Sequence, residues 1–158
     1  MTSPREADRP KETEELKVAV DVAIFDRKGR VLLGKRLTDE GFGTWGFPGG
    51  RMNPGEKIID CAQRELKEEL GDNIKIEISN QIIAVRENKI PPNFIHHVTI
   101  ILKGFLKSGK PKVMEPDKCD EWRFVEIDNL HEYPLFSGIE EALKNYVRNK
   151  TLVITDWK

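Results

Sequence analysis

The chain has 158 residues, 38% hydrophobic and 34% charged, so we expect one compact domain whose hydrophobic core lies beneath a highly charged surface. The formal net charge of -1 gives no sign of a nucleic-acid or anionic-membrane partner, because both usually require an excess of basic residues. No apolar run approaches the roughly 18 residues of a membrane-spanning helix, and no stretch resembles a secretory signal peptide. We therefore expect a cytoplasmic protein.

The first fifteen residues differ in composition from the rest of the chain. They carry eight charged residues and two prolines, and they have no apolar periodicity. Such a segment cannot bury enough apolar surface to offset the entropy lost on ordering. The sequence predicts a disordered tail over 1–15 and a single domain over 16–158.

The next segments indicate a strand pair and a glycine-rich loop. Residues 18–25 alternate and are rich in β-branched side chains, which is typical of a strand. A turn at 26–29 precedes a second strand over 30–35. Six glycines and two prolines then make 38–55 a structured loop.

The remainder of the domain alternates helices and strands. Residues 57–70 have helical periodicity and end at Gly71, a good left-handed cap residue. Further along the chain we expect strands at 74–87, 94–106 and 121–125, a turn at 91–92 and a second helix at 139–147. The segment 151–154 could add a strand or an arm to a partner subunit. The predicted fold class is α/β, a mixed sheet sandwiched between helices.

The first helix has an apolar stripe and an acidic flank. The stripe should face the sheet, and it contains Ile59, Ala62, Leu66 and Leu70. Glu65 and Glu69 lie within roughly 40° of each other on the helical wheel, and Glu68 lies on the same side. Like charges four residues apart repel by about 0.2–0.5 kcal/mol, whereas a divalent cation would make the crowding favourable. Carboxylate oxygens suit Mg²⁺ or Mn²⁺. The alternative is a solvated acidic face paired with Arg64 and Lys67.

The spacing of this segment resembles the Nudix box. That box has a glycine, five residues, a glutamate, seven residues, Arg-Glu, an aliphatic residue, any residue, Glu-Glu, any residue, a glycine and an aliphatic residue. The matching positions are Gly50, Glu56, Arg64, Glu65, Leu66, Glu68, Glu69 and Gly71. Asp72 departs from the pattern, because an aliphatic residue is expected there. Eight matches in one register are a specific signal.

The resemblance implies a role for each matching residue. Glu69 should be the main ligand of a Mg²⁺ or Mn²⁺ ion, and Glu65, Glu68 and the Gly49 carbonyl should complete the cluster. Glu65 or Glu68 would orient or deprotonate the attacking water. Glu56 and Arg64 would brace these ligands.

A further acid often comes from a loop beyond the box. Glu115 is the first candidate for it, with Asp117 and Asp120 behind it. The alternative is that all three are ordinary loop acids.

Resemblance to MutT-type nucleoside triphosphate diphosphatases extends over most of 18–147. It is carried by the segments 32–36, 48–50, 97–100, 115–119 and 135–138. It implies a nucleotide site lined by Arg36, Gly49, Thr99, Phe136, Gly138 and Ile139. The alternatives are core packing for Phe136 and Ile139 and a surface salt bridge for Arg36. Ser137 departs from these relatives, which carry a bulky aromatic residue there.

The resemblance therefore predicts an enzyme that hydrolyses a nucleoside triphosphate to the monophosphate and pyrophosphate. The alternative is another diphosphate-linked metabolite, such as ADP-ribose, a nucleotide sugar or dihydroneopterin triphosphate. ADP-ribose hydrolases tend to carry a proline where this chain has Arg86, which argues against that substrate. A nucleotide sensor without turnover would be favoured by a damaged box, but every acidic position is intact. Related proteins often pair, so a homodimer is possible.

Overall fold

The computed structural model of the chain describes residues 16–90, 95–149 and 152–153. The predicted tail at 1–15 and the predicted turn at 91–92 lie outside these residues and stay predictions. No helix among the described residues is long and apolar enough to cross a membrane.

A long mixed sheet forms the centre of the molecule. Strand β1 (Lys17–Phe25) runs parallel to β6 (Ile95–Gly109) along its whole length. Strand β5 (Ile74–Ile90) pairs antiparallel with β6, and β8 (Leu152–Val153) pairs with β5 at the edge. The prediction of a mixed sheet is confirmed, and 152–153 adds a strand to the chain's own sheet.

The other edge of β1 has two different partners. Near its start β1 pairs with β4 (Gly49–Arg51), and at Phe25 it pairs with β2 (Val31–Arg36). Strand β2 in turn pairs with β3 (Trp45–Gly46) and β7 (Cys119–Val125). Because β1 pairs with β4 near its start and with β2 at its end, the sheet divides beside β1. This division positions the site described below.

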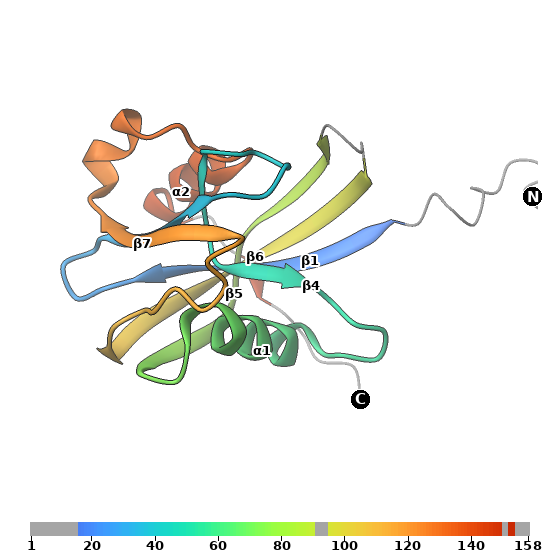
Figure 1. Cartoon of the computed structure of the whole chain (residues 1–158), viewed down its shortest axis with the longest axis horizontal. Coiled ribbons are helices and arrows are strands. Elements are labelled where there is room, and N and C mark those ends of the chain that lie inside the picture. The colour runs from blue at the N-terminus through green and yellow to red at the C-terminus, as the bar shows by residue number, and fades with distance from the viewer. Residues whose placement is uncertain (1–15, 91–94, 150–151, 154–158) are drawn as a thin grey trace, which may run out of the picture.

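The helices α1 (Ile58–Leu70) and α2 (Ile139–Val147) lie on opposite sides of the sheet (Figure 1). Alternate residues of β1 point to opposite faces, as the pleat of a strand requires. One face packs against α1 through Val20, Val22 and Ile24. The other face packs against α2 through Ala23 and Phe25. The domain therefore has two hydrophobic cores separated by the sheet, which confirms the predicted sandwich.

Most predicted elements are confirmed within a few residues. The first helix begins at Ile58 and is followed by Gly71, whose φ of 85° is in the left-handed region. The second helix has its predicted bounds. Three short elements were not predicted, namely β3, β4 and the 3-10 helix η2 (Ile127–Glu132). The first two lie inside the glycine-rich segment that the sequence indicated only as a loop.

Candidate active site

A cleft of about 620 Å³ lies where the sheet divides. This volume is in the range of small-molecule sites. Its walls come from β1, β2, β4, β5, β6, α1 and the segment before β7, so residues far apart in sequence meet there. Eight predicted site residues line it, namely Arg36, Gly49, Glu65, Glu68, Glu69, Thr99, Glu115 and Phe136. Gly50, a matched box position, lines it as well.

Glu69 joins helix α1 to strand β4. Its Oε2 accepts a hydrogen bond from the Gly49 backbone N–H at 3.1 Å. Burial raises the pKa of Glu69 to about 8, and the negative charges of Asp21, Glu65 and Glu115 act in the same direction, while the Gly49 bond opposes them. The carboxylate is therefore held where a nearby cation would favour its ionised form.

The two glycines at the start of the box allow this close approach. A Cβ added at Gly49 would collide with the Val20 carbonyl and with Asp21, and one added at Gly50 would collide with the Glu65 carboxylate. The glycines are thus required because the backbone of β4 lies directly against β1 and α1. This is a physical reason for the Pro-Gly-Gly segment that spacing alone did not supply.

Arg64 braces the acidic helix against the loop before it. Its guanidinium binds Glu56 at 2.7 Å and Glu65 at 2.7 Å, and it donates to the Arg51 carbonyl at 2.9 Å. The hydrogen bonds from Arg64 and the Asn53 N–H lower the pKa of Glu56 to about 2. The hydrogen bonds to Glu56 and Glu65 raise the pKa of Arg64. Arg64 thus links Glu56 and the Arg51 carbonyl to Glu65, and the bracing role of Arg64 and Glu56 in catalysis stays a prediction.

Glu115 lies in the cleft, whereas the two other loop acids do not line it. Glu115 is close enough to raise the pKa values of Glu65 and Glu69 by repulsion, although burial is the larger cause for both. Its Oε2 pairs with Lys118 Nζ at 2.9 Å. Asp120 instead lies 3.9 Å from Lys35 Nζ. Of the three candidates, Glu115 is the one that faces the helix glutamates.

The donor set suits a hard divalent cation, because it consists of carboxylate oxygens around a glycine backbone. Within the ranges that the structure describes, no three acidic, histidine or cysteine side chains are already arranged to hold a metal ion. Three of the carboxylates already have other partners, since Arg64 binds Glu65, the Gly49 N–H binds Glu69 and Lys118 binds Glu115. These residues fit a metal only if some of these side chains exchange partners.

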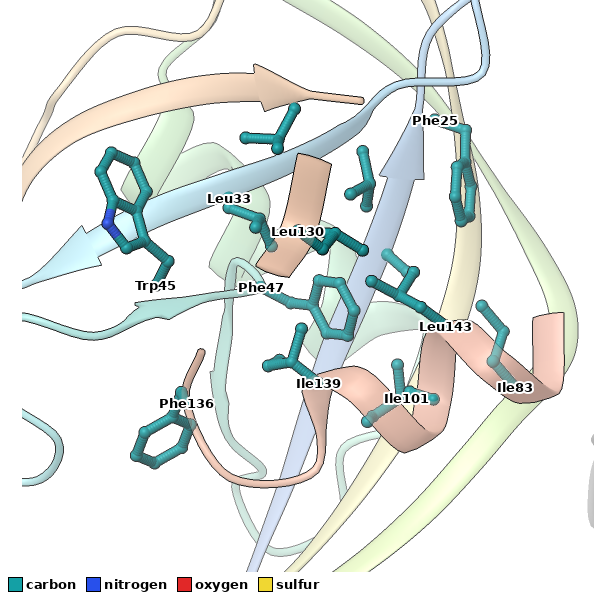
Figure 2. Close-up of a cluster of buried hydrophobic side chains, with 14 residues drawn as sticks. Phe25, Leu33, Trp45, Phe47, Ile83, Ile101, Leu130, Phe136, Ile139 and Leu143 are labelled. Carbon is teal, nitrogen blue, oxygen red and sulfur yellow. The ribbon is translucent and has the colours of Figure 1, made fainter. Parts of the chain in front are cut away.

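Two arginines lie against Phe136 at the other side of the cleft. The Arg36 guanidinium carbon is 4.1 Å from the centre of the Phe136 ring, and that of Arg86 is 4.9 Å away. Arg36 Nε also donates to the Glu40 carbonyl at 2.9 Å, so the surface salt bridge considered for Arg36 is not what holds it. Phe136 is 7% exposed, and Figure 2 shows its ring at the margin of the buried cluster, pointing away from Ile139. It lines the cleft and borders the core at once.

Ile139 does not line the cleft. It is fully buried and belongs to the core between α2 and the sheet, where it points toward Phe47 (Figure 2). The nucleotide-site position implied by the resemblance is therefore corrected to core packing, the alternative noted above. Gly138 also lies outside the lining. It has φ 84°, and a Cβ there would collide with the Arg86 side chain.

Among the cleft residues that were not predicted from the sequence, four are polar residues of the central strands β1, β5 and β6. Arg86 and Asn88 alternate on β5, His97 lies on β6, and Asp21 lies on β1. Arg86 Nη2 lies 3.3 Å from Thr99 Oγ1 and 3.5 Å from Asp21 Oδ2, and its Nη1 donates to the Ser137 carbonyl. Burial raises the pKa of Asp21 to about 6, and Arg86 opposes this shift. For Asp21 the sequence did offer a signal of a site position, because it is a charged residue inside the otherwise apolar segment 18–25.

Several known proteins are similar to this chain. The NUDIX domain family matches residues 15–146. An RNA pyrophosphohydrolase of Wolbachia sp. subsp. Brugia malayi is 30% identical over 123 residues, which are 70% of this chain and 75% of that protein. An ADP-ribose pyrophosphatase of Methanocaldococcus jannaschii is 30% identical over 135 residues, which are 84% of this chain and 74% of that protein.

A solved structure is similar along nearly its whole length. The MutT NUDIX hydrolase of Burkholderia pseudomallei is 32% identical, superposes with a TM-score of 0.74, and aligns over 84% of this chain and 98% of that one. Nudix hydrolases generally use divalent metal ions, in keeping with the carboxylate donor set at α1. The chain belongs to the Nudix family and is a hydrolase of diphosphate bonds in nucleotide-linked substrates.

Proposed function

We propose that this enzyme hydrolyses a nucleoside triphosphate to the monophosphate and pyrophosphate, with Mg²⁺ or Mn²⁺ as its cofactor. The observation that carries the proposal is the composition of the cleft. One cavity joins the glutamates of α1 and Glu115 to Arg36, Thr99 and Phe136. An acidic end suited to metal ions therefore lies in the same cavity as cationic and aromatic groups suited to a nucleotide.

In this proposal Glu65, Glu68, Glu69 and Glu115 hold the cation, and the Gly49 carbonyl joins them. A bound divalent ion would lower the pKa of water and offset phosphate charge. Glu65 or Glu68 accepts the proton of the attacking water at a carboxylate oxygen. Arg64 keeps Glu65 in place through the 2.7 Å contact between their side chains.

Arg36 and Arg86 serve the anionic part of the substrate. Their guanidinium groups are planar and always charged, and they suit phosphate oxygens. Both already lie against the Phe136 ring, so two cations and an aromatic ring meet in one part of the cleft. A base that stacks there would gain roughly 1–3 kcal/mol.

The second candidate substrate is ADP-ribose or another diphosphate-linked metabolite. It is favoured by the Methanocaldococcus jannaschii relative, which is as similar to this chain as the RNA pyrophosphohydrolase is. Against it stands Arg86, which lines the cleft and occupies the region where ADP-ribose hydrolases tend to carry a proline. The net charge of -1 argues against a long RNA substrate.

One substrate panel tests the proposal. Nucleoside triphosphates, ADP-ribose, a nucleotide sugar, dihydroneopterin triphosphate and a short RNA with a 5′-triphosphate are incubated with Mg²⁺. Release of pyrophosphate and orthophosphate is then measured separately. We expect the highest kcat/KM with a nucleoside triphosphate and pyrophosphate as the first product. A clear preference for ADP-ribose, or orthophosphate and a diphosphate as first products, would contradict the proposal.

A further inference from the structure

Several buried polar atoms in the cleft have no hydrogen-bond partner. Among the described residues they include both amide atoms of Asn88 and the Nε2 atom of His97. Both side chains line the cleft, and His97 is 8% exposed. Folded proteins leave few such atoms, because each costs free energy when it is removed from water unpaired. A ligand with a complementary polar edge would supply what these atoms lack.

Strand register brings the two side chains together. Asn88 on β5 lies directly opposite His97 on β6, in the same way that Arg86 lies opposite Thr99 two residues away. Residues two apart on a strand share a face, so all four belong to one surface. Directly opposite side chains in an antiparallel pair are close neighbours. One ligand edge can therefore contact Asn88 and His97 at the same time.

The pair lies away from the glutamates. Along the parallel pair β1 and β6, His97 is level with Lys17, whereas Asp21, next to Gly49, is level with Ile101. Four residues of strand span roughly 13 Å. Phosphates held near the glutamates and Arg86 would therefore leave the other end of a nucleotide at Asn88 and His97.

His97 has a defined hydrogen-bonding role at this position. Burial lowers its pKa, so the ring is neutral near pH 7. Its Nε2 lies 3.7 Å from Glu40 Oε1, which is too far for a hydrogen bond. This carboxylate also lines the cleft, and its charge favours the tautomer with hydrogen on Nε2. His97 is then a donor toward the cleft, while Asn88 offers one donor and one acceptor.

We propose that Asn88 and His97 read the base of the substrate and select a lactam edge, a carbonyl beside a ring N–H, as in a 6-oxopurine or a uracil ring. The inference rests on the proposed function, because it names the base class of that nucleotide. The lactam carbonyl accepts from Asn88 Nδ2 and His97 Nε2, and the ring N–H donates to Asn88 Oδ1. All three unpaired atoms are then satisfied.

An adenine ring satisfies this set less well. Its amino group and ring nitrogen pair with the Asn88 amide, but no carbonyl is present to accept from His97. Sites built to hydrogen-bond a ligand group discriminate against analogues that lack it, because their own buried polar groups are left unpaired. We therefore expect selection against adenine.

Binding of nucleoside 5′-monophosphates tests the inference without requiring turnover. Inosine, uridine and adenosine monophosphates and ribose 5-phosphate are titrated calorimetrically with Mg²⁺ into the wild type, Asn88→Leu and Glu87→Gln. Glu87 is the matched control, because it is the preceding β5 residue, is exposed and does not line the cleft. We expect the wild type and Glu87→Gln to bind the inosine and uridine ligands about tenfold tighter than adenosine monophosphate.

Asn88→Leu should lose this preference, while its affinity for ribose 5-phosphate stays unchanged. Its melting temperature without ligand should not fall, because the amide has no partner to lose. If Asn88→Leu does not fold, Asn88→Ser removes the amide with less added bulk and should lose the preference in the same way. An unchanged preference in a folded variant, or an equal loss for all ligands including ribose 5-phosphate, would overturn the inference.

The binding and turnover experiments can refute the base site and the proposed function independently of each other. A wild type that binds the lactam bases selectively through Asn88 but hydrolyses no triphosphate supports the base site and refutes the proposed function. A wild type that hydrolyses triphosphates but binds all three bases equally supports the proposed function and refutes the base site.

Discussion

Glu69 combines burial, a backbone hydrogen bond and three nearby negative charges. Its Oε2 is bound to the Gly49 N–H at 3.1 Å, and Asp21, Glu65 and Glu115 all disfavour its charged form. Without a cation, this position on balance destabilises the charged form of a carboxylate. A carboxylate that ligates a cation gains from every one of these neighbours once the cation is present.

Glu69→Gln should therefore lower kcat by roughly 100-fold or more, the scale expected when a catalytic group is lost. The glutamine keeps the size of the side chain, and its amide oxygen can still accept from Gly49. Asp60→Asn is the matched control, since it makes the same change on the exposed first turn of α1. Steady-state kinetics with Mg²⁺ measure both variants. Near-normal turnover in Glu69→Gln would mean that the acidic helix is only a solvated face.

The same residue predicts a pH dependence of stability in the metal-free protein. The pKa of Glu69 is raised from 4.5 to about 8, so the folded state holds this proton more tightly than the unfolded state. The contribution is fully present below pH 4.5 and is lost as the pH rises toward 8. Relative to Glu69→Gln, the wild type should lose on the order of a few kcal/mol over this window.

Thermal melts in EDTA at several values between pH 5 and pH 8 check the comparison. The wild-type melting temperature should fall below that of Glu69→Gln as the pH rises. Parallel curves for the two proteins would show that Glu69 is not a buried acid.

At the scale of elements, the two helices were predictable and the short strands were not. Helix α1 carries an apolar stripe and five of the eight matched box residues, and a glycine cap follows it, so local signals coincide with the fold. Strands β3 and β4 have two and three residues, too few for alternation to be read. Strand β4 forms because Gly49 and Gly50 allow close contact with β1 and α1, and β3 forms by pairing with β2. Both depend on tertiary packing.

The cleft was predictable only in part for the same reason. The glutamates of α1 share a helix, so their spacing predicts their proximity. Arg86, Asn88 and His97 meet through the register of β5 and β6, which depends on bulges and on a long pairing that no short motif encodes. Ile139 was misplaced because a resemblance transfers positions in a sequence, whereas its side chain turns into the core.

The variant Ile139→Ala tests whether this residue has a role in the core or in the nucleotide site. The fully buried side chain packs in the α2 core, so its truncation should cost about 2–5 kcal/mol of stability. KM should stay near the wild-type value in the folded protein. Arg36→Lys should show the opposite pattern, with a raised KM and little loss of stability, because it removes the planar group over Phe136. A raised KM without destabilisation in Ile139→Ala would return that residue to the site.

At the scale of the whole molecule, the net charge is near neutral although negative charges are concentrated in one region. The net charge is -1, yet one end of the cleft gathers Glu65, Glu68, Glu69 and Glu115. A triphosphate approaching that end would be repelled unless cations neutralise the carboxylates. The proposed function therefore requires metal ions, because only then can a triphosphate bind with a phosphate beside the glutamates.

Mg²⁺ should consequently raise the melting temperature of the substrate-free protein. At a concentration of 100 times Kd the stabilisation is about 2.7 kcal/mol, which corresponds to an upshift of roughly 5–10 °C for a chain of this size. Differential scanning calorimetry after EDTA treatment measures the shift, with NaCl at equal ionic strength as the control for screening. Asp60→Asn should keep the full upshift. Glu69→Gln and Glu115→Gln should both reduce it, and the second variant tests whether the loop acid exchanges Lys118 for the ion. An equal upshift in all four proteins would place the binding of Mg²⁺ elsewhere on the surface and would remove the basis for a metal-dependent mechanism in this cleft.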